Sequence, residues 1–132
     1  MVKEYFRPES LAEALDLLAR PGALALAGGT YALAFEARDK PERVVDLASV
    51  LPRSVERNGD ALSIGAGATF QELIESEATP SAVKSAAATM ANRNTRNRAT
   101  VGGNLGANKS CSSLAPVLLA LGASVTVAER GK

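Results

Sequence analysis

Ala99-Thr100-Val101-Gly102-Gly103-Asn104 and, earlier in the chain, Ala27-Gly28-Gly29-Thr30 both place two glycines beside side chains that form hydrogen bonds. Paired glycines let the backbone turn sharply and point several N–H groups in one direction, which favours binding of an anion. A plain turn explains either pair taken alone. Because the two pairs occur together, the sequence predicts a cleft in which both loops hold a diphosphate.

The residues around the two pairs exclude other nucleotide-binding motifs. Gly-Lys-Ser/Thr, which completes a Walker A loop, follows neither pair, and Gly-x-Gly-x-x-Gly with a long βαβ crossover is absent. Three arginines, Arg93, Arg96 and Arg98, precede the second pair. They either offset phosphate charge or bind backbone carbonyl groups. Their segment has no aromatic residue to stack on bases, so nucleic acid is not expected as a partner.

Charge is distributed unevenly along the 132 residues. The formal net charge is only +1, from 15 basic and 14 acidic residues, but residues 78–128 contain no Asp or Glu. The five bases of this segment are Lys84, Arg93, Arg96, Arg98 and Lys109. A segment of this length without a carboxylate is expected to meet an anion.

Composition removes several classes of chemistry. With no histidine and one cysteine, Cys111, the chain has neither a Ser-His-Asp or Cys-His catalytic group nor a zinc or iron–sulfur ligand set. We therefore predict no catalytic residue and no metal site in this chain. The N-terminus is too polar for a signal peptide, and no apolar run approaches the roughly 18 residues of a membrane span. A cytoplasmic protein without a membrane span is expected.

Hydrophobic periodicity and capping signals predict an α+β fold of two small lobes, residues 1–52 and 53–132. In the first lobe, Ser10 and Glu13 form a capping box for a helix over 10–19, and strands are expected over 23–27 and 43–47. The second lobe is expected to contain a hairpin (53–58 with 61–66), helices over 70–77, 80–90 and 114–121, a polar loop over 92–98, a short helix opened by Gly102-Gly103, and a strand over 124–128. That strand leads to Gly131, which is typical of a hairpin turn, so we expect the second lobe to be incomplete at its C-terminus.

Seven segments, taken in order, resemble a known family: Phe6-Arg7-Pro8, 11–18, 26–30, 44–47, 63–66, 96–105 and 116–123. Together they are similar to the N-terminal part of the FAD-binding (medium) subunit of the molybdenum hydroxylases, the group of xanthine dehydrogenase and carbon monoxide dehydrogenase. The resemblance implies an FAD-binding fold of the vanillyl-alcohol-oxidase (PCMH) type, with noncovalent FAD between the lobes. It also implies electron transfer: electrons come from molybdopterin and [2Fe–2S] clusters on partner subunits and leave the flavin for NAD or another acceptor.

The resemblance further implies which residues bind FAD. They lie in the two glycine loops: Leu26, Ala27, Gly28, Gly29, Thr30, Ala99, Thr100, Val101, Gly102, Gly103 and Asn104. Two further candidates differ from the family pattern, because Tyr31 stands where many members have an acidic residue and Ser113 where many have aspartate. A flavin-free assembly or docking subunit that retains the fold, and an unrelated nucleotide-binding module, remain alternatives.

Overall fold

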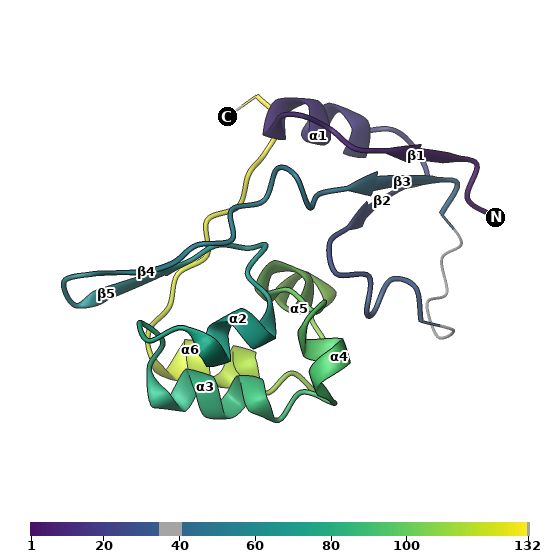
Figure 1. Ribbon diagram of the computed structural model, residues 1–132. Coiled ribbons are helices and arrows are strands. Elements are labelled where there is room, and N and C mark those ends of the chain that lie inside the picture. Colours follow the sequence, from purple (N-terminus) through teal and green to yellow (C-terminus); the bar gives the residue numbers. More distant parts are fainter. Residues whose placement is uncertain (35–40, 132) are drawn as a thin grey trace.

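The first strands of the chain form a parallel sheet. The structure, a computed structural model, describes residues 1–34 and 41–131. Strands β1 (Glu4–Phe6), β2 (Ala23–Leu26) and β3 (Arg43–Asp46) pair in the order β1-β3-β2, and both pairings are parallel. Helix α1 (Leu11–Leu18) connects β1 to β2 and packs against β2 and β3 (Figure 1). The buried residues between helix and sheet are Ala14, Leu17, Val44 and Val45.

Half of the predicted capping box of α1 is confirmed. Ser10 adopts an extended backbone conformation and its hydroxyl oxygen accepts the N–H of Glu13 at 3.1 Å. The Glu13 carboxylate accepts the N–H of Glu9 and not that of the cap residue Ser10, so the second half of the box is displaced by one residue. The helix ends at Leu18, ahead of Pro21 and of Gly22, whose φ is +71°. Beginning and end therefore follow from local sequence signals.

A hairpin follows the parallel sheet. Strands β4 (Val55–Asn58) and β5 (Ala61–Ile64) pair antiparallel, and Asn58 lies opposite Ala61. Gly59 and Asp60 form the two-residue turn, in which Gly59 has a φ of +61°. This confirms the hairpin expected from Asn58-Gly59-Asp60.

Five helices follow the hairpin: α2 (Phe70–Glu75), α3 (Ser81–Ala88), α4 (Arg93–Arg96), α5 (Val101–Ala107) and α6 (Leu114–Ala120). Helix α3 packs against α2 on one side and α6 on the other (Figure 1). Their shared core contains Phe70, Leu73, Val83 and Leu114, all fully buried. The chain is thus a mixed α/β domain.

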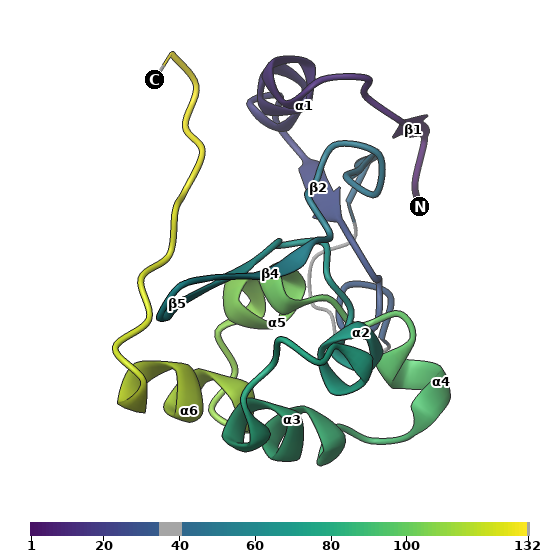
Figure 2. The same cartoon turned by 60° about the vertical axis from the view of Figure 1, so that its left-hand side comes forward.

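Two expected elements are wrong. The polar loop over 92–98 contains helix α4, because the Asn92 side chain caps it by accepting the N–H of Thr95 at 3.0 Å. The expected strand over 124–128 is extended but pairs with no strand among the described residues, and Val125 and Val127 are exposed. Figure 2 shows this segment leaving α6 and running toward α1. There Arg130 forms an ion pair with Asp16 at 2.8 Å.

Candidate functional site

A cleft of about 840 Å³ lies between the two glycine loops. Most of the candidate residues line it: Ala27, Gly28, Gly29, Thr30, Tyr31, Ala99, Thr100, Gly102, Gly103, Asn104 and Ser113. Two candidates do not. Leu26 belongs to strand β2, and Val101 is buried in the helical core. The structure therefore brings the two loops together, while Leu26 and Val101 are not part of the cleft lining.

Gly28 allows the two loops to touch. A Cβ atom at this position would lie 1.8 Å from the backbone oxygen of Arg98 and 3.2 Å from the Cα of Ala99. Any side chain here would therefore push the loops apart. Gly103 lies close to the first loop as well, since a Cβ there would be 4.0 Å from that of Ala27.

The first glycine loop has free hydrogen-bond donors. The N–H groups of Gly28, Gly29 and Thr30 donate to no acceptor in residues 1–34 and 41–131. Gly29 has a φ of +72°, and all three residues line the cleft. Consecutive N–H groups in such a turn form a concave site for an anion.

The second glycine loop differs. The N–H of Gly102 donates to Ala66 O at 2.8 Å, and that of Gly103 donates to Thr100 Oγ1 at 3.0 Å. A Cβ at Gly102 would lie 2.9 Å from that of Ala66, so glycine serves close packing here. The expectation that both loops offer free N–H groups is therefore wrong for this loop. A sequence signal existed, since Thr100 stands at the position of a helix cap.

A bridge between two threonines holds the second loop in place. Thr69 and Thr100 pair as an isolated antiparallel bridge. Around it, Phe70 N–H donates to Ala99 O and Val101 N–H to Ala68 O, both at 2.9 Å. The beginnings of α2 and α5 are thereby joined through backbone hydrogen bonds.

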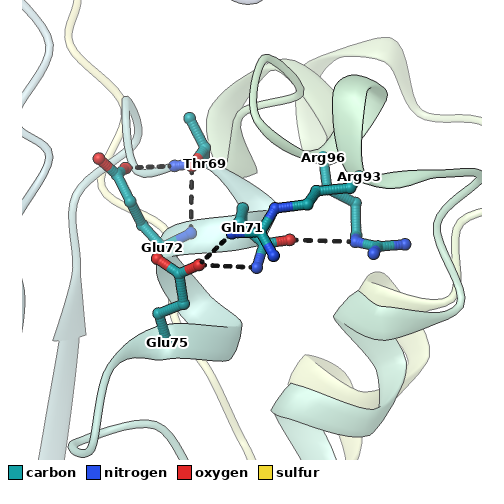
Figure 3. Close-up of polar contacts among 6 residues, drawn as sticks. All are labelled: Thr69, Gln71, Glu72, Glu75, Arg93 and Arg96. Atoms are coloured by element: carbon teal, nitrogen blue, oxygen red, sulfur yellow. Dashed lines mark hydrogen bonds and ion pairs between the residues drawn. The ribbon is translucent and has the colours of Figure 1, made fainter.

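Glu72 stabilises the α2 side of this bridge. Its N–H donates to Thr69 Oγ1, and its carboxylate accepts the Thr69 N–H at 2.8 Å (Figure 3). Arg53 binds the same carboxylate at 2.6 Å. Partial burial raises the pKa of the Glu72 carboxyl, but the Thr69 N–H and the Arg53 guanidinium outweigh it. The pKa of Glu72 therefore lies below its ordinary value.

The three arginines before the second loop are bound to protein acceptors. Figure 3 shows Arg93 beside Glu75 and Arg96 beside Gln71. Arg96 also donates to Met90 O at 3.1 Å, and Arg98 donates to Gly28 O at 3.1 Å. None of them lines the cleft. Arg96 and Arg98 therefore bind backbone carbonyls, which is one of the two expected roles, whereas Arg93 binds the carboxylate of Glu75.

Comparison with known proteins identifies the domain. The family model of the FAD-binding domain in molybdopterin dehydrogenase matches residues 1–132. The chain belongs to this family. This FAD-binding domain is 34% identical over 127 residues to YgfM of Escherichia coli K12, a match covering 95% of the chain and 49% of YgfM. It is 38% identical over 126 residues to the xanthine dehydrogenase FAD-binding subunit of Escherichia coli O157:H7, covering 87% of the chain and 42% of that subunit.

A solved structure agrees with this assignment. Carbon monoxide dehydrogenase from Hydrogenophaga pseudoflava superposes with a TM-score of 0.72 and 32% identity, over 80% of this chain and 39% of that chain. The FAD-binding domain thus spans about half the length, or less, of the proteins that it matches. In the part of the chain that the structure describes, no helix is both long and apolar enough to cross a membrane.

Among the described residues that line the cleft of the FAD-binding domain, one is charged. Lys109 lines it, and its ammonium group lies 4.6 Å from the centroid of the Tyr31 ring. No carboxylate is found among the described lining residues. Sequence analysis did not name Lys109 as a site residue, although it lies in the segment without carboxylates.

The serines of the α5–α6 connection are engaged in hydrogen bonds. Ser113 Oγ donates to Ala86 O at 2.9 Å and accepts from Thr89 Oγ1 at 2.8 Å. Ser112, also missed by sequence analysis, donates to Asn104 Oδ1 at 2.6 Å and fixes that side chain in the cleft lining. The neighbouring Cys111 is exposed and lines the cleft.

Proposed function

We propose that this FAD-binding domain is part of the electron-transfer subunit of a molybdenum-containing hydroxylase or dehydrogenase. The observation that carries the proposal is the composition of the cleft. Three consecutive N–H groups that have no acceptor among the described residues, at Gly28, Gly29 and Thr30, share it with Lys109 and with no described carboxylate. Such donors suit the diphosphate of a dinucleotide.

The residues present fit FAD. The cleft volume of about 840 Å³ falls within the range of small-molecule sites, roughly 300–1,000 Å³. In the proposed complex the first loop binds phosphate oxygens, Lys109 offsets their charge, and Ser112 holds Asn104 for a polar contact. The glycines of the second loop keep its backbone close to the first. Bound FAD supplies reversible electron uptake and release, and the domain supplies binding and orientation.

The partners and acceptor belong to the proposal too. Relatedness to xanthine dehydrogenase and carbon monoxide dehydrogenase supports partner subunits that carry molybdopterin and [2Fe–2S] clusters, with NAD or another final acceptor. We place the complex in the cytoplasm. No side chain of this domain is assigned a role as acid, base or nucleophile.

The experiment is reconstitution of the purified full-length protein with FAD. We expect a yellow protein whose bound flavin is lost in a Gly29→Val variant. Valine disfavours the positive φ of Gly29 and would therefore change the direction of its N–H, which has no acceptor among the described residues. Lys109→Met, at an exposed position, serves as a second variant whose folding is not in question. A wild-type protein that remains colourless and takes up no added FAD would overturn the proposal.

A flavin-free assembly or docking subunit is the second candidate. Ser113 favours it, because its hydroxyl is already bonded to Ala86 and Thr89 where many family members carry aspartate. The reconstitution distinguishes the two, since the docking subunit would assemble with its partners while remaining colourless. Retention of another nucleotide in place of FAD would instead favour an unrelated nucleotide-binding module.

A further inference from the structure

We infer that Arg98 is a positioning residue for the first glycine loop, a role that rests on the proposed function of that loop in binding FAD. Arg98 Nε donates to the backbone oxygen of Gly28 at 3.1 Å. Within the part of the chain that the structure describes, the Arg98 side chain forms no ion pair. Among the described residues, the Gly28 carbonyl is thus the one acceptor given for the Arg98 side chain.

Arg98 lies beside the large cleft and not among the described residues that line it. Arg98 lines an adjoining pocket of about 120 Å³, which also includes Asn97 and Arg53 and which shares Gly28 with the cleft. It is absent from the lining of the large cleft. Gly29 shows the opposite pattern, since it lines the large cleft and not the small pocket. Gly28 is among the residues that line both.

The peptide bond that joins Gly28 to Gly29 links Arg98 to the cleft. The C=O of Gly28 and the N–H of Gly29 belong to one planar trans peptide and point in opposite directions. Arg98 holds the oxygen toward the small pocket. The Gly29 N–H, which has no acceptor in residues 1–34 and 41–131, is thereby directed away from that pocket. A glycine pair can rotate such a peptide at little steric cost, so an external hydrogen bond is needed to fix its direction.

The backbone of Arg98 is itself fixed. Its N–H donates to Thr95 O at 3.0 Å, and the next N–H, of Ala99, donates to the same oxygen at 2.8 Å. The Arg98 carbonyl is the group that packs against the Cα of Gly28. The backbone carbonyl and the side chain of Arg98 therefore both contact Gly28. These contacts preorganise the first glycine loop for binding an anion.

The test compares three variants of the full-length protein. Arg98→Met removes the donor, Arg98→Lys keeps a charged N–H donor, and Arg93→Met removes the same charge from the same segment without a contact to Gly28. The first measurement, made without FAD, is the amide 1H–15N resonance of Gly29. The second is the FAD dissociation constant, with the melting temperature recorded for each variant.

We expect Arg98→Met to shift the Gly29 amide resonance in the FAD-free protein and to raise the FAD dissociation constant roughly 3- to 10-fold. Arg93→Met leaves both unchanged, and Arg98→Lys restores part of the affinity. Equal loss of affinity in Arg98→Met and Arg93→Met would show that only the loss of a positive charge matters, and would overturn the inference. An unshifted Gly29 resonance in Arg98→Met would overturn it as well. If the wild-type protein binds no FAD, the proposed function fails, while the Gly29 resonance still tests the role of Arg98.

Discussion

Thr69 and Thr100 lie opposite each other in an isolated antiparallel bridge, and each caps the helix that follows it. Thr69 Oγ1 accepts from Glu72 at the start of α2, and Thr100 Oγ1 accepts from Gly103 at the start of α5. Both threonines are buried. One pair of residues therefore fixes two helix termini and, through α5, one wall of the cleft.

Removing the cap of α5 is expected to destabilise the protein. Thr100→Val deletes the acceptor of the Gly103 N–H at nearly constant volume and should lower the free energy of unfolding by about 1 kcal/mol. Thr100→Ser retains the acceptor and should lose less. Urea unfolding monitored by circular dichroism gives both values. Equal stability of Thr100→Val and the wild type would show that the cap is dispensable.

The contact at Gly28 predicts a steric effect. Gly28→Ala places a Cβ where the Arg98 carbonyl lies, so we expect about 1–3 kcal/mol of destabilisation and loss of FAD binding. Gly106→Ala is the matched control, because a Cβ there meets nothing and the residue lies within α5. That control should raise stability by about 0.5–1 kcal/mol, since alanine favours a helix over glycine. A stable, FAD-binding Gly28→Ala protein would contradict the close approach of the two loops.

Glu72 is expected to contribute to acid sensitivity. Its pKa in the folded state lies below the ordinary value of 4.5, so its contribution to stability is present above that pH and is lost as the pH falls through the folded-state pKa. Glu72→Gln, which cannot titrate, should make the decline of unfolding free energy between about pH 5 and pH 3 shallower. Chemical denaturation at several pH values measures this slope. An unchanged slope would assign the acid sensitivity to other carboxylates.

The helical core gives a packing prediction. Leu114 is fully buried between α3 and α6, and Leu114→Ala should lower the free energy of unfolding by about 2–5 kcal/mol. Leu119 lies on the same helix but is 77% exposed, so Leu119→Ala should change stability by less than about 0.5 kcal/mol. Thermal or urea unfolding of the two variants tests the orientation of α6. Similar losses for both would contradict it.

Lys109 gives an electrostatic prediction. Lys109→Met removes the one charge among the described lining residues and should raise the FAD dissociation constant about two- to fivefold. The salt dependence of binding should weaken at the same time. Lys84→Met, which removes an equal charge outside the cleft lining, should change neither quantity. Equal effects of the two variants would point to net charge alone.

Elements with local signals were predictable from the sequence. Ser10 with Glu13, Thr69 with Glu72, and Asn58-Gly59-Asp60 each specify a cap or a turn within four residues, and the structure contains all three. Helix α4 also had a local signal in Asn92, which the density of polar residues around it obscured. A strand, by contrast, needs a partner, and none pairs with residues 124–128 in the described structure.

The sequence allowed most of the residues that line the cleft to be predicted, but not their hydrogen-bond partners. Paired glycines indicate where a backbone turns or packs closely, but not which acceptors reach its N–H groups. The acceptor of Gly102 is Ala66, 36 positions earlier in the chain, and only the folded structure reveals it. The same holds for Arg98 and Gly28, which the sequence separates by 70 positions.

The exposed thiol of Cys111 makes the cleft accessible to site-specific labelling. It is the only cysteine in the chain and lines the cleft, so a maleimide dye reacts at one defined position there. Emission from that dye would respond to colourless occupants such as ADP as readily as to a flavin. A protein that never turns yellow would then still reveal whether its cleft takes up a nucleotide.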